Sequence, residues 1–159
     1  MLTYERVTEP TPEQLKLVLL ADPNQTLVET YLPQSAVYAA NDVTGLAGIL
    51  VVKRFAPRVV EVMAIAVTPA KQRHGYGRAL LTFAYQWAIE HGYRTLRIAT
   101  GTTSLTQLYL YQQQGFRVIA VEPDYFTQNY PQTIVENGLI LRDRLVLERP
   151  IHLPKLPHE

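Results

Sequence analysis

A short glycine-bearing loop between an apolar segment and a helical pattern has the composition of an anion-binding site. The loop reads Gln-Arg-His-Gly-Tyr-Gly at residues 72–77, and it follows the apolar residues 59–67. Gly75 and Gly77 let a backbone approach a ligand closely and adopt φ values that other residues resist. Backbone N–H groups at the start of a helix have no partner within the helix, so they can bind a phosphate group. The loop therefore predicts an anion site.

Side chains at the edge of the loop, those of Gln72, Arg73 and Arg78, can donate further hydrogen bonds to an anion. The competing interpretation is that Gly75 only ends a tight turn and that the arginines are solvated. Two common nucleotide motifs do not fit. A dinucleotide fingerprint needs a third glycine or alanine where Leu80 stands, and a P-loop needs Gly-Lys-Ser/Thr where the chain has Gly77-Arg78-Ala79.

The composition is that of one globular domain. The chain has 159 residues, 47% of them hydrophobic, with 15 Lys+Arg against 14 Asp+Glu and a net charge of +1. This balance lacks the basic excess of a nucleic-acid-binding protein. No cysteine is present, which excludes disulfides, thiolate metal sites and an acyl-cysteine intermediate. The four histidines show no metal-ligand spacing, so we expect no metal site.

The N-terminal residues MLTYERVTEP lack the pattern of a signal peptide, and the longest apolar runs are too short to span a bilayer. We therefore expect a soluble cytoplasmic protein without membrane contact. Its domain is predicted to cover residues 1–149. Residues 150–159 carry three prolines and are predicted to form an extended tail.

The elements that must position the loop follow from the spacing of apolar and turn residues. Strands are predicted at 2–7, 35–40, 46–55, 59–67, 95–99, 116–121 and 139–147. Helices are predicted at 13–20, 24–31, 77–91 and 104–114, the first capped by Thr11 and the third ended by Gly92. The third helix should bury Leu80, Leu81, Ala84, Trp87 and Ala88.

Two connections define the predicted topology. Turn residues at 41–45 indicate an antiparallel hairpin, which the next turn extends into a three-strand meander. The strand at 59–67, the helix at 77–91 and the strand at 95–99 form a right-handed parallel crossover. Ligands of such a unit gather at the carboxyl ends of its strands, where the loop lies. Residues 122–138 show no clear period and are predicted to be a long functional loop.

Two segments carry a resemblance to a known family. Gln72-x-x-Gly75-x-Gly77 resembles the pyrophosphate-binding motif of the GNAT superfamily of acyl-CoA N-acyltransferases, and residues 110–116, Leu-Tyr-Gln-Gln-Gln-Gly-Phe, look like a second segment of that family. The order of elements over residues 1–147 is also similar. The resemblance implies an α/β fold with a mixed, mostly antiparallel twisted sheet, flanking helices and one central βαβ crossover. It also implies an N-acetyltransferase that uses acetyl-CoA.

The resemblance implies where the cofactor lies. Acetyl-CoA would lie between the strands 59–67 and 95–99, with its pantetheine beside Ala66 and Val67 and a backbone N–H near Val67 stabilising the oxyanion. Ser104 stands where family members often carry an asparagine that contacts the pantetheine, but serine is also a natural helix cap. The diphosphate would bind the side chain of Gln72 and the backbone N–H groups of Arg73, His74, Gly75, Tyr76, Gly77 and Arg78.

Two catalytic roles follow from the same resemblance. Tyr111 corresponds to the tyrosine that faces the thioester sulfur, where a phenol can protonate the departing thiolate. The alternative is that Tyr111 packs its helix against the sheet. Glu61 corresponds to a glutamate that serves some members as general base, and strand alternation predicts that it shares a face with Met63, Ile65 and Val67. It could instead be a surface residue paired with Arg58, and a water could be the base.

The acceptor remains open at this stage. The enzyme would transfer acetyl directly to a primary amine of a small molecule or peptide, while the alternatives are a non-catalytic acyl-CoA sensor and transfer to a protein N-terminus or lysine. Asp124 and Glu136 lean toward a cationic acceptor. The late loop and terminal strand offer surface for a homodimer. Five side chains of the late loop either form a pocket for the acceptor or pack the loop onto the sheet: Tyr125, Phe126, Asn129, Tyr130 and Glu136.

Overall fold

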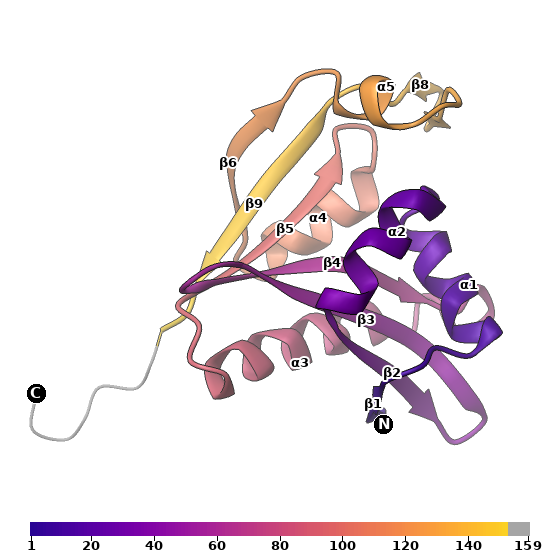
Figure 1. Ribbon diagram of the computed structural model, residues 1–159, viewed down its shortest axis with the longest axis vertical. Helices are drawn as coiled ribbons and strands as arrows, with labels where there is room; N and C mark the ends of the chain where they lie inside the picture. The colour runs from indigo at the N-terminus through magenta and orange to yellow at the C-terminus, as the bar shows by residue number, and fades with distance from the viewer. Residues whose placement is uncertain (153–159) are drawn as a thin grey trace, which may run out of the picture.

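A twisted seven-stranded sheet with helices on both faces forms the protein in the computed structural model, which describes residues 1–152 (Figure 1). The strand order is β1-β2-β3-β4-β5-β9-β6, and every pair is antiparallel except β4 with β5. The predicted mixed fold with one parallel crossover is thereby confirmed. The strands are β1 (Thr3–Val7), β2 (Ala36–Asp42), β3 (Gly45–Ala56), β4 (Val59–Val67), β5 (Thr95–Gly101), β6 (Arg117–Glu122) and β9 (Arg144–Pro150).

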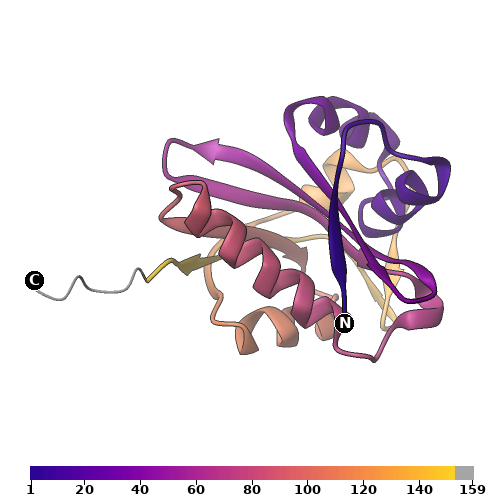
Figure 2. The same ribbon diagram turned by 90° about the horizontal axis from the view of Figure 1, so that it is seen from below.

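The helices form a layer on each face of the sheet (Figure 2). On one face lie α1 (Pro12–Ala21) and α2 (Gln25–Tyr31), which is followed by the 3-10 turn η1 (Leu32–Gln34). On the other lie α3 (Tyr76–Glu90) and α4 (Leu105–Gln113), and the 3-10 turn η2 (Pro69–Lys71) precedes α3. Thr11 caps α1 in a capping box with Gln14, as the Thr-Pro start predicts.

Each helix layer packs on its own apolar cluster. The cluster beneath α3 and α4 contains all of the predicted core residues of α3, namely Leu80, Leu81, Ala84, Trp87 and Ala88. The cluster beneath α1 and α2 is centred on Val18, Val28 and Ile49, each no more than 1% exposed. The sheet is therefore fixed from both sides, which holds β4 in the middle of the molecule.

An irregularity in β4 changes which way its side chains point. Val62 pairs with Val52 and Ala64 pairs with Val51, so Met63 has no partner in β3. Such a bulge shifts the alternation of faces by one residue. Ile65 and Val67 consequently pack toward α3, while Glu61 lies on the opposite face from Val62. The prediction that Glu61 shares a face with Ile65 and Val67 is therefore wrong.

β4 and β5 separate toward their carboxyl ends. Their pairing runs only from Val59 with Thr95 to Val62 with Ile98, although both strands continue beyond it. From Met63 onward, the edge of β4 on the β5 side thus has no paired strand formed by residues 1–152. A slot opens between the two strands, directly before the loop at residues 72–77.

The segment after β6 is more ordered than the sequence pattern predicts. Instead of a long loop, it contains α5 (Tyr125–Asn129) and a hairpin of β7 (Val135–Glu136) with β8 (Leu139–Ile140). The hairpin turn is Asn137-Gly138 with φ values of 53° and 75°, and Asn-Gly is a common two-residue turn for hairpins. The predicted strand at 139–147 is correspondingly wrong, since β8 and β9 are separate strands.

The folded part of the chain extends past the predicted domain boundary. Pro150 pairs with Thr95, and Ile151 is 7% exposed and donates its N–H to the Arg94 carbonyl at 2.9 Å. Residues 153–159 of the predicted tail lie outside the described part of the chain. Within residues 1–152, no helix is long and apolar enough to cross a membrane.

Candidate active site

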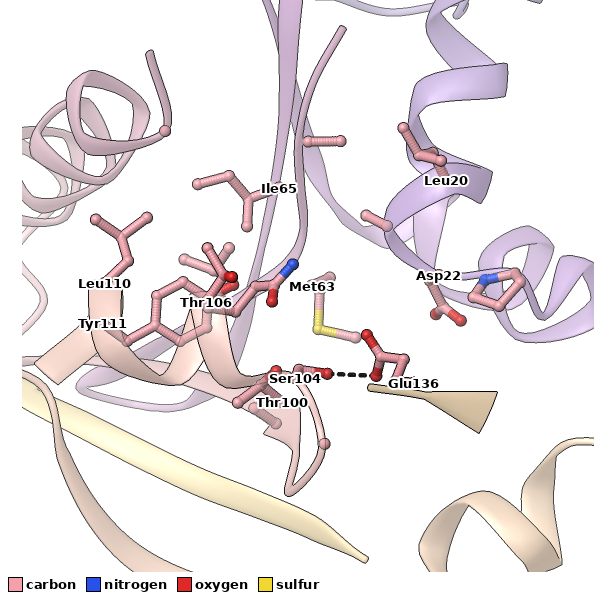
Figure 3. A pocket seen from close by; sticks show the side chains of 18 of the residues that line it. Leu20, Asp22, Met63, Ile65, Thr100, Ser104, Thr106, Leu110, Tyr111 and Glu136 are labelled. Carbon is pink, nitrogen blue, oxygen red and sulfur yellow. Dashed lines mark hydrogen bonds between the residues drawn. The ribbon is translucent and has the colours of Figure 1, made fainter. Parts of the chain in front are cut away.

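One cavity of about 790 Å³ runs from the loop after β4, through the slot between β4 and β5, to α2, α5 and β7 (Figure 3). Most of the predicted site residues line it, among them Glu61, Ala66, Val67, Ser104 and Tyr111. His74 is exposed and is not part of the lining. The cavity also reaches Asp22 and Pro23, which the sequence pattern did not single out.

The loop presents a run of free backbone donors to this cavity. Arg73 and Gly75 have φ values of 67° and 79°, so the chain turns sharply before α3 begins. Within residues 1–152, the backbone N–H groups of residues 73–78 have no protein acceptor; the N–H of Ala79, which bonds to the Gly75 carbonyl at 3.1 Å, is the first to find one. Such a nest of N–H groups at a helix start binds a diphosphate.

Asp42 at the end of β2 holds this loop in place. It accepts hydrogen bonds from Lys71 at 2.8 Å and from the Tyr76 hydroxyl at 3.1 Å. Thr44 also donates to Asp42, through its N–H at 2.9 Å and its hydroxyl at 2.8 Å. The hydrogen bond from Lys71 and, next, those from Thr44 hold the pKa of Asp42 well below its usual range. The Tyr76 side chain thus anchors the loop, while its N–H remains free. Sequence reasoning assigned Asp42 only to a turn.

The slot between the strands offers polar backbone to a ligand. Beyond Val62, the backbone groups on the β5 side of β4, next to Ala66 and Val67, have no strand partner in the described part of the chain. Gln72 returns toward the same strand end, since its Nε2 donates to the Val67 carbonyl at 3.2 Å. An extended chain with amide groups fits such an edge, because it can take the hydrogen bonds that a further strand would make.

Tyr111 points from α4 into the cavity (Figure 3). The residue is 5% exposed, and its hydroxyl has no hydrogen-bond partner within residues 1–152. Burial raises the pKa of the Tyr111 phenol above its ordinary value of 10.0, so the phenol stays protonated at neutral pH. Tyr109 on the same helix is 67% exposed.

Ser104 does not cap α4 with its side chain. Its hydroxyl instead donates to Oε1 of Glu136 at 2.7 Å, and Thr103 donates to the same oxygen at 3.2 Å (Figure 3). The Asn137 amide binds the Thr103 carbonyl at 2.8 Å. The β7–β8 hairpin is thereby tied to the start of α4, and it places Glu136 against the cavity.

Glu61 lines the cavity, but not among apolar side chains alone. Arg97, its neighbour on β5, binds Oε1 of Glu61 through Nε at 2.8 Å. The guanidinium also lies 3.6 Å from Glu148 and 4.1 Å from the Phe55 ring. The alternative prediction, an ion pair of Glu61 with Arg58, is therefore wrong. The strand pattern predicted apolar neighbours for Glu61, but the structure gives the carboxylate an ion pair with Arg97.

Asp22 follows α1 at the end of the cavity far from the loop. Two phenols bind it: Tyr130 donates to Oδ1 at 2.6 Å and Tyr31 donates to Oδ2 at 3.2 Å. Burial and the adjacent Asp22 raise the pKa of both phenols, so both remain donors. The sequence could not indicate this cluster, since Asp22 and Tyr130 are separated by 108 residues.

Residues 122–138 both line the cavity and pack against the start of α2. Tyr125, Phe126, Tyr130 and Glu136 belong to the lining, while Asn129 does not. The Asn129 carbonyl instead accepts a hydrogen bond from the Asn24 side chain at 2.7 Å, which joins α5 to the start of α2. As for metals, no group of three His, Cys, Asp or Glu side chains suited to bind one occurs within residues 1–152.

Enzymes that take an acyl group from coenzyme A need a diphosphate-binding loop, a slot for the pantetheine arm and a group to protonate the thiolate. The fold and the cavity suit a protein of this class. Comparisons with known proteins narrow it further. Residues 3–116 match the profile of the Acetyltransferase (GNAT) family. The chain therefore belongs to the GNAT family of acetyltransferases.

Several relatives resemble the chain over nearly its whole length. An uncharacterised Bacillus subtilis N-acetyltransferase, YvbK, is 38% identical over 146 residues, which are 92% of this chain and 94% of the relative. A B. subtilis acetyltransferase crystallised with CoA is 37% identical, with a TM-score of 0.92 over 96% of this chain and all of the other. An Elizabethkingia anophelis family member with bound acetyl-CoA is 35% identical, with a TM-score of 0.90 over 94% and 97%.

Proposed function

We propose that the protein transfers the acetyl group of acetyl-CoA directly to a primary amine. One observation carries this proposal: the free N–H groups of residues 73–78 and the hydroxyl of Tyr111, which has no protein partner within residues 1–152, face the same cavity. The first suits a diphosphate and the second suits a thiolate leaving group. Two structural relatives with CoA or acetyl-CoA bound support the same cofactor.

The chain's own groups fit the cofactor along its length. The N–H groups of residues 73–78 would hold the diphosphate, aided by the side chains of Gln72, Arg73 and Arg78. The free edge of β4 at Ala66 and Val67 would pair with the pantetheine amides. Ser104 gives its proton to Glu136, so it would only accept a hydrogen bond from the pantetheine.

Acetyl-CoA supplies an activated thioester. The residues around it would stabilise the oxyanion, accept the proton of the amine and protonate the thiolate. A free backbone N–H of β4 near Val67 would stabilise negative charge on the thioester oxygen. Glu61 would accept the proton of the attacking amine through water; Arg97 binds its Oε1 and leaves Oε2 without a partner among residues 1–152. Tyr111 would protonate the departing thiolate. Because the chain has no cysteine, no acyl-cysteine intermediate can form, and in this proposal the amine attacks the thioester directly.

Calorimetry with CoA and a thiol-release assay with acetyl-CoA and a panel of amines test the proposal. We expect tight CoA binding and amine-dependent thiol release. Binding without release for any amine would instead identify an acyl-CoA sensor. Absence of CoA binding would remove the cofactor assignment altogether.

A further inference from the structure

We infer that the acceptor is an amine that carries a second positive charge and that Asp22 binds this charge. The inference rests on the proposed function and specifies its substrate class. Its starting point is the opposite character of the two ends of the cavity. The loop end carries the free N–H groups and the side chains of Arg73 and Arg78, whereas the far end carries Asp22 and Glu136.

Asp22 is prepared as an anion without a cationic partner. The two phenols and the backbone N–H of Asn24, at 3.3 Å, donate to its oxygens, and all three donors are neutral. Within residues 1–152, no lysine, arginine or histidine forms an ion pair with it. Neutral donors fix the direction of the carboxylate and leave its full negative charge for a ligand.

The charged side chains around Asp22 do not cancel the negative charge of its carboxylate. Glu61 is neutralised by Arg97, and Arg144 by Glu122, which binds it at 2.8 Å. Glu136 accepts only hydroxyl donors and likewise forms no ion pair within residues 1–152. The far end of the cavity therefore has a negative balance, which favours a cationic acceptor and disfavours one with a carboxylate.

Aromatic rings form the wall beside Asp22. Phe126 lies 5.3 Å from Tyr130 and 5.2 Å from Tyr125, measured between ring centroids. Tyr31 completes the lining from α2. Ring faces attract ammonium groups and also accept the methylene chain between two charges. This wall therefore suits an aliphatic dication better than a compact polar amine.

The unpartnered Tyr111 hydroxyl marks the other end of the acceptor's path. Tyr111 is 5% exposed and lines the same cavity as Asp22 (Figure 3). A reacting amine near Tyr111 and a second ammonium at Asp22 would occupy both groups at once. The acceptor would then span the cavity between them.

The test compares α,ω-diamines with monoamines of equal length in the thiol-release assay. Putrescine, cadaverine and hexamethylenediamine are paired with butylamine, pentylamine and hexylamine, and γ-aminobutyrate places a carboxylate at the second position. We expect the best diamine to exceed its monoamine by about 10-fold to 100-fold in kcat/KM, as for one charge-assisted hydrogen bond. We expect γ-aminobutyrate to be the poorest acceptor.

Asp22→Asn keeps the shape of the side chain and removes its charge. The diamine preference should fall to about threefold or less, mainly through a higher KM for the diamine. Glu29→Gln, on the exposed side of α2 and outside the cavity lining, is the matched control and should keep the preference. Calorimetric binding of CoA shows whether each variant is folded.

The outcomes separate the two proposals. Thiol release with monoamines and diamines at equal efficiency would overturn the dication inference and leave the acetyltransferase function standing. A preference that survives Asp22→Asn would exclude Asp22 as its cause. No release with any amine would overturn both. The comparison on the unmodified protein decides whether the acceptor needs a second positive charge even if the Asp22 variant does not fold.

Discussion

The two proposed catalytic residues differ in their partners: the Tyr111 hydroxyl has none within residues 1–152, whereas the Glu61 carboxylate forms an ion pair. Tyr111 is buried and its hydroxyl has no partner within residues 1–152, so its proton is available to a ligand. Glu61 is held at 2.8 Å by Arg97, and its free oxygen is the one that could act. The two assignments therefore call for different measurements.

Replacing Tyr111 with phenylalanine should remove the proton donor and little else. We expect kcat to fall by about 100-fold or more, with the CoA dissociation constant nearly unchanged. Since burial raises the pKa of Tyr111 above 10.0, the unmodified enzyme should lose no activity through its ionisation below that pH. Tyr109→Phe on the exposed side of α4 is the control. An unchanged rate in Tyr111→Phe would exclude the tyrosine from the chemistry.

Replacing Glu61 with glutamine tests the base. Thiol release should drop by about 100-fold or more in kcat, because the amide of glutamine cannot accept the proton of the amine. Glu148→Gln is the matched control, because Glu148 also contacts Arg97, at 3.6 Å, but does not line the cavity. If Glu136→Gln shows this pattern and Glu61→Gln does not, Glu136 is the base.

Helix α3 carries a glycine just outside each end, and the two positions are alike in backbone and space. Gly75 has φ of 79° and Gly92 has φ of 78°, and a Cβ at either would meet no atom within 4 Å. Only Gly75 belongs to the loop that faces the cavity. The pair therefore separates the cost of left-handed backbone from the cost of blocking a ligand.

Leucine at either glycine should lower the free energy of unfolding by a similar amount, about 1–2 kcal/mol. Gly75→Leu should in addition raise the CoA dissociation constant by at least about tenfold, since a bulky side chain would obstruct the diphosphate-binding N–H groups. Gly92→Leu should bind CoA as the unmodified protein does. Thermal melts and calorimetry on the two variants check this, and equal CoA affinities would contradict a cofactor site at the loop.

The ligand site lies in the slot between two halves of the sheet. Within the part of the sheet that residues 1–152 form, the half β1 to β4 is hydrogen-bonded to the half β5, β9 and β6 through a short parallel pairing, and α3 with its apolar cluster packs on both halves. A cofactor in this slot would contact both halves. Binding should therefore stabilise the fold as a unit.

We expect CoA at 100 times its dissociation constant to stabilise the protein by about 2.7 kcal/mol and to raise Tm by about 5–10 °C. NAD at the same concentration is the control, because the loop lacks the third small residue of a dinucleotide motif. Differential scanning calorimetry measures both. A shift caused equally by NAD would show that the loop binds diphosphates without preference for CoA.

The assembly state stays a prediction. Among the described residues 1–152, strand β6 is at the edge of the sheet and pairs only with β9, and its Val118, Ile119 and Val121 are 44%, 52% and 56% exposed. An apolar edge strand of this kind is compatible with the expected homodimer, since such edges tend to be covered. Light scattering in solution would measure the state directly.

Local chemistry in the sequence determined much of the fold and part of the site. The Thr11-Pro12 cap, the apolar face of α3 and the glycines of the loop act over a few residues, so their spacing alone predicts α1, α3 and the anion site. The Asn137-Gly138 turn carried a similar local signal for the β7–β8 hairpin, which the long-loop prediction missed.

Only the tertiary structure decided which side chains of distant elements contact each other in the site. The bulge at Met63 arises from pairing with β3 and puts Glu61 on the opposite face from Ile65 and Val67, while the register of β4 with β5 sets Arg97 beside Glu61. Ser104 meets Glu136, and Asp22 meets Tyr31 and Tyr130, across separations that no periodicity encodes. The loop can be recognised from local spacing, and Tyr111 from the resemblance of residues 110–116 to the GNAT family. The acidic end of the cavity exists only because distant elements pack together, and a sequence pattern does not specify which distant residues will meet.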